Sequence, residues 1–221
     1  MNSEKKNYYD HDATWKKRRE LGTPIWGSYS YKMYREVLDA ILEFHKEHEL
    51  SVLDIGCGAG AFGEFLRSTK ETTALSDQEF SFLGIDSSNE AIELGKERFN
   101  SLNLECIDFA SGPCPVDFHR RFSVVTAINV LHCLVKAEHR LQMLKNLQAC
   151  LKPGGLSIVT GMIKPVLDDY RETINARYYA DRDELIAEYK EVGLGKIVFE
   201  RTQLASGRAK ISNHFAILSL S

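Results

Sequence analysis

The chain has 221 residues, a formal net charge of −3 at pH 7 and an apolar fraction of 43%. This length fits one α/β domain with a sizeable core, and the slight acidic excess argues against a protein devoted wholly to binding nucleic acid. The sequence has no apolar run near the roughly 18 residues that a membrane span requires. Residues 1–10 lack the apolar core of a signal peptide. We therefore expect one soluble domain over residues 1–221, without a membrane partner.

The first 49 residues divide into an aromatic, charged segment and a helix. Residues 1–30 show no regular period, and we expect them to form a lid that orders when a ligand binds. The basic run at residues 16–19 is interpreted as a solvated helix face, with contacts to RNA phosphates as the alternative. From Tyr31 to Glu49 apolar residues recur at helical spacing, which predicts an amphipathic helix.

The middle of the chain alternates between short apolar runs and helical patterns. Strands are predicted at 51–55, 82–86, 103–107, 122–128 and 155–161, and helices between them at 60–69, 88–99 and 136–151. Residues 68–81 are rich in Ser, Thr and Glu and predict a long surface loop. This alternation is typical of a parallel sheet covered by helices.

The last 41 residues follow another pattern. A helix is predicted from Asp181, which caps its start, to Val192, with Gly193 ending it. Two strands follow at 196–201 and 213–218, with no room between them for a crossover helix, so they are expected to pair antiparallel. The predicted fold class is α/β, a doubly wound, mostly parallel seven-stranded sheet with a C-terminal antiparallel hairpin.

A glycine-rich turn with an acid beside it is the most specific local feature. Val52–Gly60 has the pattern of an apolar strand that ends in Asp54 and a turn with glycines at 56, 58 and 60. Residues 58–63 also satisfy the dinucleotide pattern G-x-G-x-x-G, which is weak evidence alone. Asp54 would repel a pyrophosphate and attract an ammonium group. The acid therefore favours S-adenosylmethionine over NAD as the ligand of this turn.

Val52–Gly60 resembles the first motif of the class I (Rossmann-like) S-adenosylmethionine-dependent methyltransferases. Four further segments match the family in its order, at 84–88, 106–109, 124–134 and 151–155. The resemblance implies a Rossmann-like fold, S-adenosylmethionine as cofactor and S-adenosylhomocysteine as product. It also implies a division into an N-terminal cap and helix (1–49), a cofactor-binding half (50–161), a substrate-lining insertion (162–180) and a C-terminal helix and hairpin (181–221).

The resemblance also implies which residues bind the cofactor. Asp86 would accept hydrogen bonds from the ribose hydroxyls and Asp108 from the adenine amino group, with Phe109 either near the ring or simply in the core. Of Ser87 and Ser88, one is as easily explained as a helix cap. Asn129 and Val130 would lie beneath the methionine part. The expected cofactor-binding residues are Asp54, Gly56, Cys57, Gly58, Gly60, Asp86, Ser87, Asp108, Phe109 and Asn129.

His132 is the candidate catalytic base, because it follows the fourth strand, where the acceptor should face the methyl group. The alternative is a histidine that only packs or donates a hydrogen bond. Residues 129–132 lack the Asn/Asp-Pro-Pro-Tyr/Phe tetrapeptide, which argues against methylation of amino groups on nucleic-acid bases or glutamine. No Cys or His spacing predicts a metal site.

The acceptor is expected to be a small molecule, methylated on O, N or C. Its pocket would be formed by segments rich in aromatic residues and cations, unless these segments merely cover the edges of the sheet; they contain Tyr8, Tyr9, Trp15, Trp26, Tyr29, Lys164, Tyr170, Arg171, Arg177, Tyr178 and Tyr179. The alternatives are a tRNA or rRNA methyltransferase, a non-catalytic S-adenosylmethionine-binding regulatory module and an NAD-dependent oxidoreductase. Five scattered cysteines suit a reducing cytoplasm, with Cys106, Cys133 and Cys150 expected to be buried. A homodimer is an open possibility.

Overall fold

The computed structural model describes residues 11–22, 28–73, 75–163, 180–204 and 212–220. Its helices and strands, in chain order, are α1 (His11–Glu20), α2 (Ser28–Phe44), β1 (Glu49–Ile55), α3 (Ala61–Thr69), β2 (Glu79–Asp86), α4 (Asn89–Arg98), β3 (Asn103–Cys106), β4 (Phe122–Ile128), α5 (Ala137–Cys150), β5 (Leu151–Ile163), α6 (Arg182–Glu191), β6 (Lys196–Leu204) and β7 (Ser212–Ser219). Short 3₁₀ helices occur at η1 (Lys70–Thr72), η2 (Val116–Phe118) and η3 (Leu131–Cys133).

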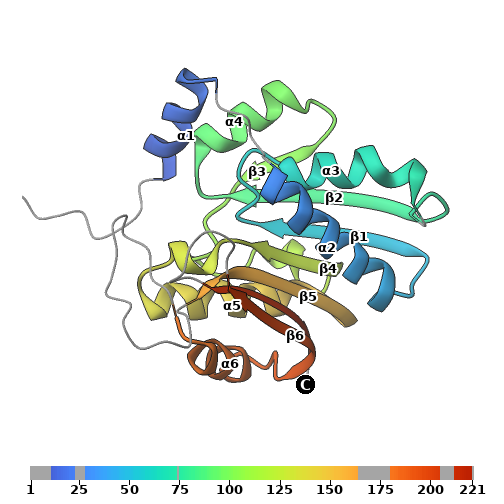
Figure 1. Cartoon of the computed structure of the whole chain (residues 1–221), viewed down its shortest axis with the longest axis vertical. Coiled ribbons are helices and arrows are strands. Elements are labelled where there is room, and N and C mark those ends of the chain that lie inside the picture. The colour runs from blue at the N-terminus through green and yellow to red at the C-terminus, as the bar shows by residue number, and fades with distance from the viewer. Residues whose placement is uncertain (1–10, 23–27, 74, 164–179, 205–211, 221) are drawn as a thin grey trace, which may run out of the picture.

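The strands form one seven-stranded sheet in the order β3-β2-β1-β4-β5-β7-β6 (Figure 1). Strands β1 to β5 are mutually parallel, whereas β7 is antiparallel to both of its neighbours. The order reverses between β1 and β4, the place where doubly wound sheets bind ligands. The predicted fold class is confirmed, including the antiparallel hairpin.

The two faces of the sheet bury alternate residues of each strand, as the two-residue period of a strand requires. Leu53 and Ile55 of β1 pack in the same cluster as residues of α5 and α6. Leu50 and Val52 pack instead with residues of α2 and α3. Helices therefore cover both faces, and the cofactor-binding turn emerges from a strand that is buried on both sides.

Several element boundaries differ from the prediction, mostly because strands are longer than their apolar runs, and three of these differences concern a helix or a loop. The helix predicted to reach Glu49 ends at Phe44, because Glu49 already pairs with Glu79 in the sheet. The loop predicted over 68–81 is shorter, since α3 continues to Thr69, η1 follows and β2 begins at Glu79. The helix predicted to end at residue 151 ends at Cys150, and β5 starts directly after it.

Helix α1 was not predicted as an element, since residues 1–30 carry no apolar period. It buries none of its residues and is held by polar contacts to α4, beside which it lies in Figure 1. Asp12 accepts hydrogen bonds from Ser88 Oγ at 2.6 Å and from the Glu90 backbone N–H at 3.3 Å. Arg19 forms an ion pair with Glu97 at 3.4 Å. These bonds between distant residues leave no trace in hydrophobic periodicity.

Some predictions fall outside the described residues. This applies to Tyr8, Tyr9 and Trp26, to the side chain of Tyr29, and to the candidate acceptor residues of the 162–180 segment, because residues 164–179 are not described.

Among the helices that are described, none is long and apolar enough to cross a membrane. The described residues also contain no cluster of His, Cys, Asp or Glu that could hold a metal ion. Cys106 was expected to be buried and is exposed.

Candidate active site

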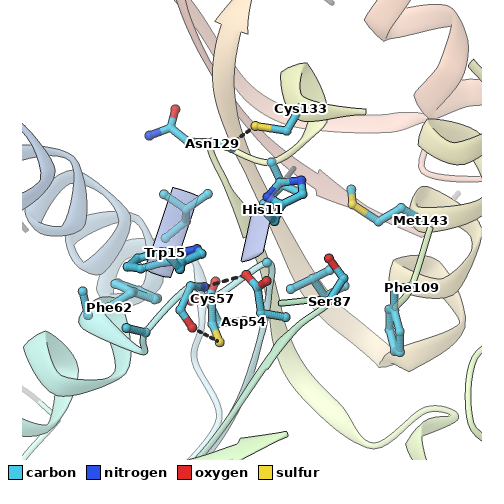
Figure 2. Close-up of a pocket in the computed structure, with 18 of the residues that line it drawn as sticks. His11, Trp15, Asp54, Cys57, Phe62, Ser87, Phe109, Asn129, Cys133 and Met143 are labelled. Carbon is cyan, nitrogen blue, oxygen red and sulfur yellow. Dashed lines mark hydrogen bonds between the residues drawn. The ribbon is translucent and has the colours of Figure 1, made fainter. Parts of the chain in front are cut away.

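A cavity of about 270 Å³ opens at the carboxyl ends of β1, β2 and β4, where the strand order reverses (Figure 2). In Figure 2, Trp15 and Phe62 lie on one side of the cavity and Phe109 and Met143 on the other. Nine of the ten predicted cofactor residues line this cavity, all except Gly60: Asp54, Gly56, Cys57, Gly58, Asp86, Ser87, Asp108, Phe109 and Asn129. Residues up to 75 positions apart in the chain thus meet at one edge of the sheet.

The glycine turn has the backbone conformation that the sequence predicts. Gly56, Gly58 and Gly60 have φ values of +70°, +56° and +78°, a region that L-residues with a side chain rarely adopt. Space restricts two of them as well. A Cβ at Gly56 would collide with Val130, and one at Gly58 would lie 2.6 Å from Trp15 Cζ2. Gly60 is the N-cap of α3, so it shapes the turn without lining the cavity.

Asp86 fixes the glycine turn at the end of β2. Its Oδ2 accepts a hydrogen bond from the Gly58 N–H and its Oδ1 from the Ser88 N–H, both at 2.8 Å. The carboxyl group is 7% exposed, and burial raises its pKa, whereas the two backbone N–H donors oppose the rise. Each carboxylate oxygen has further lone pairs, so Asp86 can hold the turn and still accept a bond from a ligand hydroxyl.

Asp54 lies deeper, at the end of β1. Its side chain is 2% exposed and accepts a hydrogen bond from Thr126 Oγ1 at 2.7 Å. Burial raises the pKa of Asp54 to about 7, and the hydrogen bond from Thr126 only partly offsets this. A buried carboxylate with a raised pKa is stabilised by a cation placed beside it. Asp54 is therefore suited to a ligand that brings a positive charge into the cavity.

Asp108 and Phe109 follow β3 on the opposite side of the cavity. Asp108 is exposed and accepts hydrogen bonds from the Ala110 N–H at 2.8 Å and from Ser111 Oγ at 2.6 Å. Phe109 is 3% exposed and packs against Phe118, with ring centroids 6.1 Å apart. Phe109 thus belongs both to the core and to the cavity wall. The two predictions made for it, a place near the adenine ring and a place in the core, each describe part of its environment.

Asn129 follows β4 in a left-handed conformation, with φ +61°. Its N–H donates to the Thr160 carbonyl at 2.9 Å, and its Nδ2 donates to Met33 Sδ at 3.2 Å. A non-glycine residue in this region stores strain, which the surrounding bonds must overcome. The hydrogen bond to Met33 directs the side chain toward α2.

Comparisons with known proteins agree with this geometry. Residues 53–157 match the family model described as "Methyltransferase domain". The curated carboxy-S-adenosyl-L-methionine synthase of Trichodesmium erythraeum is 26% identical over 159 residues, which span 68% of this chain and 58% of that protein's length. Over these residues the chain is similar to methyltransferase domains, in agreement with the resemblance of its motifs to the class I S-adenosylmethionine-dependent methyltransferases.

Two solved structures show the same methyltransferase fold. Magnesium protoporphyrin IX methyltransferase from Synechocystis PCC 6803, with bound S-adenosylmethionine, superposes with a TM-score of 0.65 at 14% identity, covering 99% of this chain and all of the other. The [4+2]-cyclase SpnF superposes with a TM-score of 0.65 at 17% identity, covering 89% of this chain and 83% of the other. At these identities the likeness establishes the fold and not the reaction. The cofactor expected from the sequence, S-adenosylmethionine, is the one bound in the Synechocystis structure.

The residues through which α1 and α2 close this cavity were assigned elsewhere or not at all from the sequence. Trp15 was expected at the acceptor pocket and lies against the glycine turn, with the Arg18 guanidinium 5.0 Å from the centre of its indole ring. Arg18 also lines the cavity, so the basic run at 16–19 is only partly a solvated helix face. Tyr34 of α2 is partly buried and lines the cavity near Asp54, and desolvation raises its pKa. Tyr34 was predicted only as an apolar helix position, and its place against the cavity depends on how α2 packs.

His132 is not among the residues that line the methyltransferase cavity. It is 4% exposed and lines a separate cavity of about 10 Å³ with Tyr189, His214 and Arg140, on the α5–α6 side of the sheet. This space is close to the size that one water molecule needs. Its role as a base stays a prediction, and its position favours the alternative of a histidine that packs or bonds within the fold.

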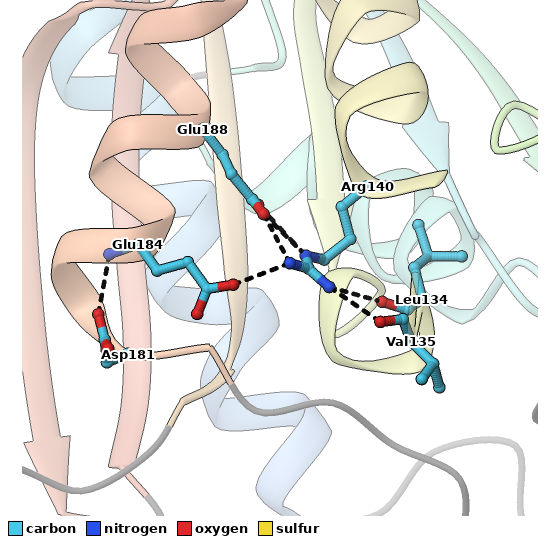
Figure 3. Close-up of polar contacts among 6 residues, drawn as sticks. All are labelled: Leu134, Val135, Arg140, Asp181, Glu184 and Glu188. Atoms are coloured by element: carbon cyan, nitrogen blue, oxygen red, sulfur yellow. Dashed lines mark hydrogen bonds and ion pairs between the residues drawn. The ribbon is translucent and has the colours of Figure 1, made fainter. Parts of the chain in front are cut away.

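Arg140 of α5 fixes η3, the short helix that contains His132 (Figure 3). Its Nη1 donates to the carbonyls of Leu134 and Val135 at 3.3 and 3.2 Å, and its Nη2 donates to Glu188 at 2.7 Å and Glu184 at 2.9 Å. The Arg140 side chain is 2% exposed. Because Leu134 lines the cofactor cavity, this buried network connects the cavity wall to α6.

Proposed function

We propose that the protein transfers the methyl group of S-adenosylmethionine to a small-molecule acceptor. The observation that carries the proposal is the single cavity into which the glycine turn, Asp54, Asp86 and Asp108 all face. The cavity offers a buried acid to a cation and carboxylates to hydroxyl and amino groups. This donor and acceptor set fits a ligand with an ammonium, a ribose and an adenine.

In the proposed complex the methionine end lies over Asp54 and the adenosine end lies between Asp86 and Asp108. Asp54 pairs with the α-ammonium, Asp86 accepts from the ribose hydroxyls, and Asp108 accepts from the adenine amino group. Charge-assisted bonds of this kind are roughly twice as strong as neutral ones. The other predicted residues position the cofactor by shape and by backbone N–H donors; they are Gly56, Cys57, Gly58, Ser87, Phe109 and Asn129. Gly60 contributes indirectly, by shaping the turn.

Methyl transfer is an in-line displacement. A lone pair of the acceptor forms a bond to the methyl carbon, while the electrons of the carbon–sulfur bond return to sulfur and leave neutral S-adenosylhomocysteine. A proton on the attacking atom passes to a base or to water. Positioning of the two reactants therefore supplies much of the rate enhancement.

Calorimetric titration tests the cofactor, with S-adenosylmethionine, S-adenosylhomocysteine and NAD as ligands. We expect the first two to bind and NAD not to bind, because Asp54 disfavours a pyrophosphate at the turn. Binding of NAD alone would overturn the proposal in favour of an oxidoreductase. Transfer of tritium from the labelled methyl group to fractions of a metabolite extract then tests the reaction and identifies the acceptor.

Two alternatives give different results in the same assays. An RNA methyltransferase would label tRNA or rRNA and bind it with a strong dependence on salt. A regulatory module would bind S-adenosylmethionine and label nothing. We favour the small-molecule acceptor because the two arginines of the basic run are engaged locally, Arg18 at the cavity and Arg19 with Glu97. We further propose a cytoplasmic location, and a homodimer is tested by sedimentation.

A further inference from the structure

A second cavity of about 70 Å³ adjoins the cofactor cavity, between α2 and the C-terminal hairpin. Met33 and Asn129 line both cavities. The Met33 thioether accepts hydrogen bonds from Asn129 Nδ2 at 3.2 Å and from Thr160 Oγ1 at 3.4 Å, which holds it at the junction. A methionine side chain is unbranched and adaptable, so it forms a partition that a ligand can displace.

The second cavity lies where an acceptor has to be. Asn129 and Thr160 are at the carboxyl ends of the neighbouring strands β4 and β5, the edge of the sheet to which the cofactor cavity also belongs. An acceptor that entered here would reach the cofactor cavity past Met33, at the end that Asn129 lines. In the proposed complex this is the methionine end, which carries the methyl group.

The charged groups of this cavity favour an anion. Lys32 and Arg201 contribute two positive charges to its lining and Glu36 one negative charge. Arg201 Nη2 donates to Glu36 at 2.6 Å, and its guanidinium lies 5.8 Å from the centre of the Phe215 ring. A guanidinium carries five N–H donors, so Arg201 can hold Glu36 and a second carboxylate together. The sulfonium of the cofactor would add a further positive charge nearby.

We propose that this second cavity is the acceptor subsite and that it selects small acceptors that carry a carboxylate, held by Arg201 and Lys32. The inference rests on the proposed function and adds the chemical class of the acceptor. The carboxylate lies at the hairpin end, and the atom to be methylated lies toward Met33. Glu36 shares the Arg201 guanidinium with the acceptor and repels its carboxylate, so it lowers the affinity of the subsite.

Ligand-observed ¹⁹F NMR tests the subsite on the protein saturated with S-adenosylhomocysteine. The probes are small fluorinated hydroxycarboxylates, each paired with its neutral primary amide. We expect the carboxylates to bind at least tenfold more tightly than the amides. Arg201→Gln and Lys32→Gln should each weaken carboxylate binding by about tenfold, because each removes a charged donor to the carboxylate.

Glu36→Gln separates a binding role from a structural one. If Glu36 only stabilises the fold through Arg201, its removal lowers the thermal stability and leaves carboxylate binding unchanged or weaker. The proposal predicts instead that the freed guanidinium binds carboxylates more tightly, by about threefold to tenfold. The matched control is Arg35→Gln on the same helix. The ion pair of Arg35 with Asp39 lies outside the cavity lining, so this substitution should change neither the binding of the carboxylates nor that of the amides.

The outcomes distinguish this inference from the proposed function. Equal binding of acids and amides, or no gain in Glu36→Gln, overturns the carboxylate subsite even where S-adenosylhomocysteine binds and an extract fraction is methylated. Failure of S-adenosylmethionine and S-adenosylhomocysteine to bind overturns the proposed function itself, and the subsite with it. Preference for acids that is lost in Arg201→Gln and enhanced in Glu36→Gln supports both.

Discussion

The region around the cofactor cavity and the region of the hairpin and α6 hold their charged groups in different ways. Around the cofactor cavity, carboxylates at strand ends accept hydrogen bonds from neutral donors: Asp86 from the Gly58 and Ser88 N–H groups, and Asp54 from Thr126 Oγ1. On the side of the hairpin and α6, charged side chains pair with one another. Arg140 reaches Glu188, 48 residues away, and Arg201 reaches Glu36, 165 residues away. The first side depends on neutral donors at strand ends, and the second on ion pairs between separate elements.

This difference shows which side can vary. A carboxylate that fixes a glycine turn, as Asp86 does at Gly58, constrains the residues of that turn. An ion pair between distant segments restricts the residue types at its two positions only, and the neighbouring positions can take other residues. The acceptor side can therefore change its charges without disturbing the cofactor corner. Substitutions on the two sides test this separation.

The largest effect is expected from Arg140→Ala. The substitution removes the partner of Glu188, which is 7% exposed, and leaves a buried charge unpaired. Breaking a buried pair in this way costs about 3–5 kcal/mol of unfolding free energy. Urea denaturation measures the loss. The control is Arg35→Ala, which breaks an exposed i,i+4 pair and should cost about 0.5 kcal/mol or less. Equal losses would show that the α5–α6 network does not hold this side together.

Asp86→Asn is expected to act on the cofactor side with little effect on the hairpin. The amide replaces a carboxylate oxygen that accepts from Gly58 or Ser88, so the turn loses a charge-assisted bond. We expect about a hundredfold weaker binding of S-adenosylmethionine, since such bonds contribute roughly 1.5–3 kcal/mol. Calorimetry measures it, with the exposed Asp117→Asn as a charge-matched control. Unchanged affinity would remove Asp86 from the proposed cofactor contacts.

Asp54 predicts a proton release on cofactor binding. Because its pKa in the fold is about 7 and its ordinary value is 3.8, its contribution to stability is complete below pH 3.8 and is lost as the pH rises through about 7. The ammonium of the cofactor reverses this by favouring the carboxylate. At pH 7 binding should release roughly half a proton. Calorimetry in phosphate and Tris buffers measures it, and Asp54→Asn should abolish the dependence on buffer.

Asp54→Asn also tests whether Asp54 serves cofactor binding or the stability of the fold. A neutral residue at this buried position relieves the desolvation of the carboxylate, so the unliganded protein should keep its stability above pH 7 while cofactor binding weakens. A variant that loses stability and affinity in equal measure would contradict a role for Asp54 in binding the ammonium.

The smallest effect is expected at the start of α4. Ser88 is its N-cap, with Oγ accepting from the Ala91 N–H at 3.2 Å and donating to Asp12. Ser88→Ala should cost about 1 kcal/mol of unfolding free energy. Ser87 is exposed and lines the cavity, so Ser87→Ala should leave stability unchanged and act on cofactor affinity alone. Thermal unfolding and calorimetry of the pair show which serine caps and which faces the ligand.

Much of the cofactor corner could be predicted because its physics is local. A glycine turn after a buried strand requires positive φ values, which glycine adopts readily. The acids at the ends of the next two strands, Asp86 and Asp108, can be located because each directly follows an apolar run. The antiparallel hairpin was predictable because the eleven residues between its predicted strands are too few for a helical crossover. The predictions failed where pairing between strands outweighed local pattern, as at Glu49 and Leu151, and where a helix buries none of its residues, as in α1.

The sequence by itself determined the alternation of strands and helices in the cofactor half, the glycine turn and the acids around it, because these depend on hydrophobic periodicity, on backbone conformation and on strand ends that meet at one edge. Only the tertiary structure decided that Trp15, Met33 and Tyr34 close the cavity, that His132 lies outside it, and that Lys32 and Arg201 share a second cavity. The physical reason is distance along the chain. Periodicity reports which face of a helix is buried, but packing decides what that face meets.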